Sequence, residues 1–160
     1  MNVMESLIKY LRDLPSDVTV VCIDGKMTAQ SLLISRNEVF RKMLNNGFKE
    51  TNSKIIEFPT RNLYVVETVL NYLQFGDPPQ TLSVQDLMDV LGMADEYQIP
   101  DLVIDVTTII KNTLLNPEKA FKFFDLSTDN PLMCELRTRA YSVIEHAIKK
   151  GHHAFICCNN

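Results

Sequence analysis

The chain lacks the features on which nucleic-acid binding and membrane insertion depend. It has 160 residues and a formal net charge of -4, and its longest basic runs are pairs such as Lys149-Lys150. Binding to nucleic acid through phosphate neutralisation is therefore disfavoured. No apolar run reaches the roughly 18 residues that would span a bilayer, and the N-terminal residues lack the basic-then-apolar order of a signal peptide. We expect no nucleic acid and no membrane as partners, and a cytoplasmic and/or nuclear location.

Sequence motifs for catalysis are also missing. Glycine is scarce, with 5 residues, and there is no phosphate-cradling loop or nucleophile elbow. The 3 histidines all lie at the C-terminal end, and carboxylates such as Asp17 and Asp24 have no visible acid/base partner. We expect neither an enzyme nor a bound cofactor.

The 4 cysteines do not form the spaced framework of a secreted disulfide scaffold. Cys22 lies in a predicted strand, Cys134 lies in a helical pattern, and Cys157-Cys158 are adjacent in the tail. With His152-His153, these tail cysteines could in principle ligate a metal. Zinc sites usually pair their ligands as C-x₂₋₄-C with a second matching pair, and the sequence has none, so we expect no metal site.

The segment 16–51 carries the clearest structural signal. Asp17–Ile23 is rich in β-branched residues with apolar side chains on both faces, which suits a strand covered on both sides. Asp24-Gly25 predicts a two-residue type I′ hairpin turn. Lys26–Gln30 alternates apolar and polar residues, as expected for an antiparallel strand packing one face on a core. Two short helices are expected next, over Ser31–Ile34 and Asn37–Leu44, followed by a helix stop at Asn45-Asn46-Gly47.

An amphipathic helix is predicted ahead of this segment, over residues 3–14. Apolar residues recur at three- and four-residue intervals, at Met4, Leu7, Ile8, Leu11 and Leu14. Leu14-Pro15 ends the helix, because the residue before proline avoids the α region. Such a helix either covers its own core or offers a self-complementary surface to a second copy. From the residues alone, the first interpretation is favoured.

The rest of the chain alternates a short strand with helical patterns. Lys54–Phe58 is predicted as a strand that Pro59 ends. Thr60 is the expected N-cap of a helix reaching Phe75, Ser83 caps the next helix, and Pro100 begins another. Asn116-Pro117 is the expected internal boundary, and beyond it two helices over 117–126 and 132–150 are expected to dock on the preceding ones. We assign residues 1–115 to one domain, 116–150 to a helical pair and 151–160 to a tail.

This α+β arrangement resembles the BTB/POZ fold, a small sheet flanked by helices. The resemblance covers about residues 3–115. The matching positions are Asp17-Val18, Ala29-Gln30-Ser31, Leu32–Ser35, Val39-Phe40 with Met43, Gly47–Thr51, Val69–Pro78 and Asp86–Val103.

The resemblance implies a non-enzymatic adaptor. Many members of this shape dimerise through the helix before the first strand and bind cullin-3, the scaffold of an E3 ubiquitin ligase. Residues 3–14 would then be a dimer helix, which reverses the interpretation from the residues alone. The implied dimer interface comprises Met4, Leu7, Ile8, Leu11 and Asp17.

The resemblance also implies a cullin-binding site. Phe48-Lys49-Glu50 stands where such members carry a hydrophobic-x-Glu signature, and residues 116–150 resemble their three-box, or the start of a BACK domain. The implied contacts with the cullin-3 N-terminal region are Phe48, Lys49, Glu50, Met43, Tyr97, Asn116 and Phe121. An exposed aromatic anchor of this kind commonly dominates an interface. The alternative is that Phe48 folds back onto its own core.

Two departures from the family pattern bear on function. Gln30 replaces the family's histidine in the pocket, shared with Asp17, that repressor members use, which argues against corepressor recruitment. No Kelch, MATH or zinc-finger segment is expected after residue 150. The favoured function is a homodimeric adaptor linking cullin-3 to an unknown substrate protein. The alternatives are a dimerisation module that competes with other adaptors and a transcriptional or assembly scaffold without cullin.

Overall fold

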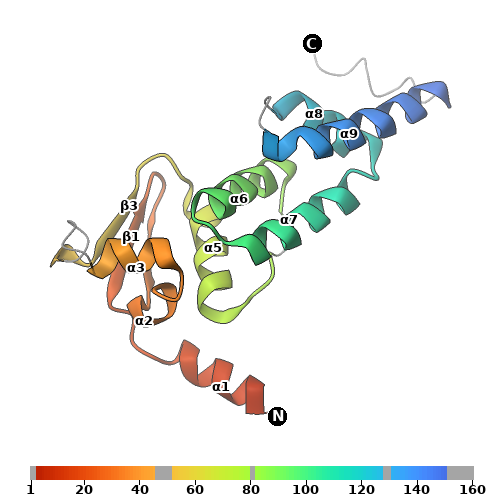
Figure 1. The fold of residues 1–160 in the computed structure, drawn as a ribbon. Helices are drawn as coiled ribbons and strands as arrows, with labels where there is room; N and C mark the ends of the chain where they lie inside the picture. Colours follow the sequence, from red (N-terminus) through yellow and green to blue (C-terminus); the bar gives the residue numbers. More distant parts are fainter. Residues whose placement is uncertain (1–2, 46–51, 80–81, 128–130, 151–160) are drawn as a thin grey trace.

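The computed structural model describes residues 3–45, 52–79, 82–127 and 131–150, and its architecture is α+β, as predicted (Figure 1). Three strands form one sheet, and helices make up most of the remaining chain. In chain order the elements are α1 (Val3–Arg12), β1 (Val18–Cys22), β2 (Lys26–Ala29), α2 (Ser31–Ile34), α3 (Glu38–Asn45), β3 (Ile55–Phe58), α5 (Leu63–Phe75), α6 (Val84–Glu96), α7 (Pro100–Thr113), α8 (Pro117–Leu126) and α9 (Pro131–Lys149).

β1 is the central strand of the sheet, whose order is β2-β1-β3. It pairs antiparallel with β2, with Val18 opposite Ala29, and parallel with β3, with Val20 opposite Ile56. One face of β1 is buried and the other is half-buried. The predicted covering on both faces therefore holds only in part, because Ile23 follows the strand and is exposed.

The link between β1 and β2 is not the predicted type I′ turn. Neither Asp24 nor Gly25 has a positive φ, which that turn requires at both positions. Gly25 instead packs closely on α5, since an added Cβ would lie 2.8 Å from Cδ2 at the end of the Leu63 side chain. Asp24 also faces α5, where its Oδ1 accepts a hydrogen bond of 2.6 Å from the Leu63 backbone N–H. The hairpin is thus shaped by the start of α5.

That contact also corrects the predicted cap of α5. The sequence pointed to Thr60 as N-cap, but Asn62 occupies this position and its side chain makes no cap bond. The Asp24 carboxylate, in the link between β1 and β2, accepts the hydrogen bond from the first N–H of α5 instead. By contrast, Ser83 caps α6 as predicted, since its side chain accepts from the Asp86 N–H.

The core is continuous from the sheet to α9. Buried apolar residues of β1 and β3 belong to the same cluster as those of α5, α6 and α7, and the cluster continues into Ala120 and Phe123 of α8 and Leu136 of α9. The helical pair α8–α9 therefore docks on the preceding helices, as its small size required. In Figure 1 the sheet with α3 lies at one end of the molecule, α8 and α9 lie at the other, and α1 projects outside the main body.

Candidate functional site

The predicted cullin signature, Phe48-Lys49-Glu50, lies outside the described residues, as does the helix stop Asn46-Gly47. The same holds for the tail residues His152-His153 and Cys157-Cys158. The structure describes the elements that flank the signature in the chain, α3 before it and β3 after it.

Tyr97, at the C-terminal end of α6, lies against α3. Its ring stacks on Phe40 of α3 with centroids 5.0 Å apart and an interplanar angle of 20°, and it meets Phe58 of β3 at 5.8 Å. The Asn37 side-chain amide donates to the Tyr97 carbonyl at 2.8 Å. Burial raises the pKa of Tyr97, so its phenol stays neutral and can donate a hydrogen bond. Tyr97 is therefore a rigid, half-buried aromatic group with a polar tip.

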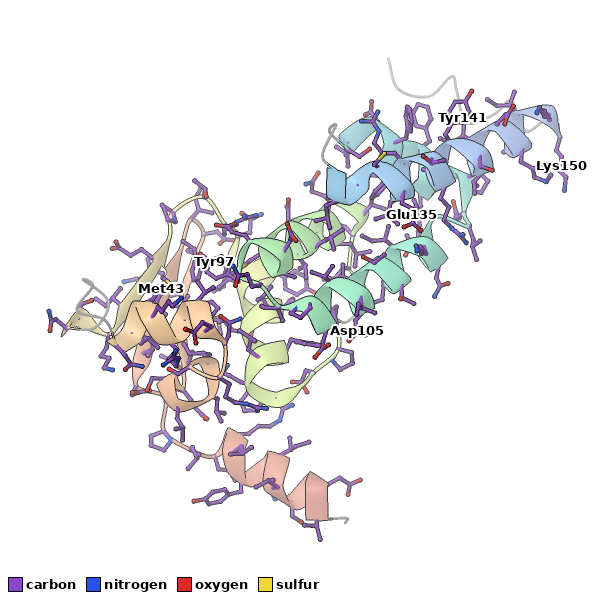
Figure 2. The ribbon with its side chains drawn as sticks, viewed as in Figure 1. Met43, Tyr97, Asp105, Glu135, Tyr141 and Lys150 are labelled. Carbon is purple, nitrogen blue, oxygen red and sulfur yellow. The ribbon has the colours of Figure 1, made fainter. Side chains whose placement is uncertain are left out.

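Met43 lies close to this group. It is on α3, one turn after Phe40, and packs partly buried against the core. In Figure 2 the labelled Met43 lies on α3 and the labelled Tyr97 at the C-terminal end of α6, on the side of α3 that faces α6. Met43 thus lies two residues before the described chain stops at Asn45, and Tyr97 packs on Phe40, one turn earlier on the same helix.

Asn116 and Phe121 belong to α8, Asn116 as its N-cap and Phe121 within the helix. A shallow hollow of about 270 Å³ joins the first residues of α6 to α8, with Val84, Thr113 and Lys119 among its lining residues. α6 has 13 residues, so this end is about 20 Å from Tyr97 at 1.5 Å per residue. Phe121 is 37% exposed. The Asn116 side-chain oxygen accepts from the Glu118 and Lys119 N–H groups, so it caps α8.

The predicted dimer helix carries exposed apolar side chains. Leu7 is 48% exposed, and Ile8 and Leu11 are half-buried. Tyr10 and Val3, which the sequence analysis did not single out, are also exposed. The Met4 side chain lies outside the described set.

Asp17, the remaining predicted dimer residue, is bound to Ser31 within its own chain. Its two carboxylate oxygens accept from the Ser31 backbone N–H at 2.8 Å and from the Ser31 hydroxyl at 2.6 Å. These hydrogen bonds hold the pKa of Asp17 below its ordinary value. The carboxylate thus positions the start of α2.

A set of contacts at the C-terminal end of α1 was missed in the sequence. The Gln30 side-chain nitrogen donates to the carbonyl oxygens of Leu11 and Leu14, and the Gln30 backbone N–H donates to Gln74 Oε1. Gln74 could have been found from its spacing, because it follows Val66 and Leu70 of the buried stripe of α5 at four-residue intervals.

Arg12 makes a second contact between α1 and the end of α5. Its Nη2 lies 2.6 Å from both carboxylate oxygens of Asp77, and its guanidinium carbon lies 4.4 Å from the centroid of the Phe75 ring. An open groove of about 320 Å³ borders this pair and the outer face of α5. The sequence analysis did not single out Arg12.

None of the helices in the described part of the chain is long and apolar enough to cross a membrane. Within the same residues, no group of three histidine, cysteine, aspartate or glutamate side chains is arranged to hold a metal ion.

Comparison with known proteins supports a protein-interaction module. BTB/POZ domain-containing protein 9 of Drosophila melanogaster is 28% identical over 101 residues, which are 62% of this chain. The chain spans 14% of the length of that relative. Residues 8–114 match the BTB/POZ domain, which is typically a non-catalytic module for protein interactions. The chain therefore belongs to the BTB/POZ family.

Proposed function

We propose that the protein is a homodimeric adaptor that binds the N-terminal region of cullin-3 and links it to a target protein in an E3 ubiquitin ligase. The proposed contact surface comprises Phe48, Lys49, Glu50, Met43, Tyr97, Asn116 and Phe121. The proposed dimer surface is formed by α1, with Met4, Leu7, Ile8 and Leu11, and by Asp17 beside it.

The observation that carries the proposal is the continuous core between the Tyr97 end of α6 and the helical pair α8–α9. Residues 116–150, which we assign to a three-box or partial BACK segment, share this core through Ala120, Phe123 and Leu136. The salt bridge from Lys111 Nζ to Glu135 Oε1, at 2.6 Å, adds a contact between α7 and α9. Shared packing of this kind holds both ends of a surface about 20 Å long in fixed positions. A partner can then contact both ends with little ordering cost.

The proposed anchor has a physical rationale. Phe48 would insert into a groove of the partner, while Met43 and Tyr97 would provide a preorganised apolar surround for it. Aromatic residues in well-packed, desolvated positions supply most of the energy of many interfaces. The Phe40 and Phe58 rings that fix Tyr97 reduce the side-chain entropy lost on binding.

Titration calorimetry with the purified cullin-3 N-terminal region tests the proposal. The Phe48→Ala, Glu50→Lys double variant should lose binding, because it removes the anchor and reverses the neighbouring charge. Ile104→Ala is the matched control, since Ile104 is 63% exposed on α7, outside the proposed surface. Absence of binding at micromolar concentration, or full binding by the double variant, would contradict the proposal.

A second measurement distinguishes an adaptor that delivers a target from a module that only competes with other adaptors. Reconstituted ubiquitination of co-purified proteins should depend on the same Phe48 and Glu50 side chains. Cullin binding without ubiquitination of any associated protein would mean that the chain occupies the ligase without delivering a target.

A further inference from the structure

A buried glutamine pair lies where α1 meets the rest of the domain. Gln30 is 5% exposed and Gln74 is 4% exposed, and the two are joined by a buried hydrogen bond. Figure 1 shows α1 outside the main body, beside the end of α5. The contacts of Gln30 are therefore in a position to control how α1 leaves the domain.

The Gln30 side chain is committed to the C-terminal end of α1. Its Nε2 lies 2.8 Å from the Leu11 carbonyl oxygen and 2.9 Å from the Leu14 carbonyl oxygen. The atom between two acceptors must be the amide nitrogen, because an oxygen there would be repelled by both carbonyls. The Leu11 carbonyl also accepts from the Leu14 N–H at 3.3 Å, so the Gln30 amide adds a second bond to Leu11 and ties the residues that follow the helix to the domain. Although Gln30 is the N-cap residue of α2, its side chain makes no cap bond there.

The other end of the same amide group is not satisfied. Gln30 Oε1 is buried and has no hydrogen-bond partner in the part of the chain that the structure describes. A buried acceptor without a partner is unfavourable, and an apolar side chain of similar size would avoid that cost. Methionine would fill the same space. What methionine cannot supply is the pair of donors to Leu11 and Leu14.

We propose that Gln30 is the positioning residue that fixes the direction of α1 and thereby orients the self-association surface. The role of Gln30 in orienting a dimer surface rests on the proposed function. Its hydrogen bonds to α1 lie within one chain and can be tested without the dimer. Since α1 would contribute a symmetric surface, a change in its direction would displace both halves of the interface.

The Arg12 contact is secondary in this arrangement. The side chains of Arg12 and Asp77 are 45% and 37% exposed, and exposed ion pairs contribute little to stability. The two bonds from Gln30 are partly buried and join an uncharged amide to carbonyl groups, so salt does not weaken them in the same way. Gln30 is therefore the residue whose loss should release α1.

Hydrogen exchange on α1 amides tests this in the full chain. The Leu7→Asp background removes the proposed contact with a second copy, so that exchange reports only the attachment of α1 to its own domain. Adding Gln30→Met should accelerate α1 exchange roughly ten- to a hundredfold, as expected for the loss of two net hydrogen bonds. The melting temperature of the domain should stay the same or rise, because the unpaired Oε1 is removed.

Gln74→Met is the matched control. It leaves the buried Gln30 N–H without its acceptor, so it should lower the melting temperature while the Gln30 side chain keeps its bonds to α1. Unchanged α1 exchange in Gln30→Met, or a fall in melting temperature as large as that of Gln74→Met, would overturn the assignment.

A result that refutes the proposed dimer can be distinguished from one that refutes the role of Gln30. With Leu7 intact, Gln30→Met should raise the dimer dissociation constant roughly tenfold. A monomeric unmodified protein would refute the dimer in the proposed function, and the exchange experiment would still decide whether Gln30 fixes α1.

Discussion

Replacing Leu7 with aspartate should dissociate the proposed dimer. Leu7 is 48% exposed on α1, so about half of its side chain is available to a second copy. Full burial of a leucine side chain contributes about 1.5–3 kcal/mol, which gives about 1 kcal/mol for the exposed half. In a two-fold symmetric interface the residue counts twice, so the loss is about 2 kcal/mol per dimer. This corresponds to a rise in Kd of roughly 30-fold at 1.4 kcal/mol per tenfold change, and an unpaired buried carboxylate adds to it.

Sedimentation equilibrium or light scattering over a concentration series measures this shift. Lys9→Asp is the control, because at 3.6 residues per turn Lys9 lies about 160° around α1 from Leu7 and is exposed, so an aspartate there should leave Kd unchanged. Circular dichroism should show that both variants remain folded. A folded unmodified protein that is monomeric at all concentrations would refute the reasoning, as would equal effects of the two substitutions.

Three further predictions concern single contacts within the domain. Asp24→Ala should lower the unfolding free energy by about 1 kcal/mol in urea titrations, because the Leu63 N–H loses its cap. An unchanged unfolding free energy would show that the bond does not stabilise α5. Because folding lowers the pKa of Asp17, its ionised carboxylate stabilises the fold at pH values above the ordinary aspartate pKa. This stabilisation is lost as the pH falls through the folded-state pKa. Ser31→Ala should therefore flatten the decline of stability below about pH 4, and an unchanged acid profile would contradict this. Tyr97→Phe should keep the aromatic stacking and the melting temperature, so any loss of cullin binding in calorimetry would assign the contact to its hydroxyl.

Local patterns in the sequence predicted most helices within a few residues. Ser83 caps α6 and Pro100 opens α7, as their positions indicated. Caps and proline positions act through the backbone of the next few residues, so they can be recognised without knowledge of the fold. The boundaries were less accurate, since α1 ends at Arg12 and not at Leu14.

Features created by contacts between distant segments were predicted wrongly or missed. Gly25 and Asp24 looked like a hairpin turn, but the first packs closely on the Leu63 side chain and the second caps α5. Gln30 was noticed only as a departure from the family pattern, and Gln74 was not singled out. These two residues lie 44 positions apart in the chain, and no local periodicity reports such a pairing.

The sequence alone determined the order and type of the elements and the BTB/POZ family, because apolar periodicity and turn residues act over short stretches of chain. It also placed an apolar stripe on residues 3–14. Only the tertiary structure decided that α1 keeps Leu7 exposed while Gln30 and Arg12 hold its C-terminal end. It also decided that Tyr97 is fixed against Phe40. These outcomes depend on which surfaces remain after the core has packed, and packing is a property of the whole chain.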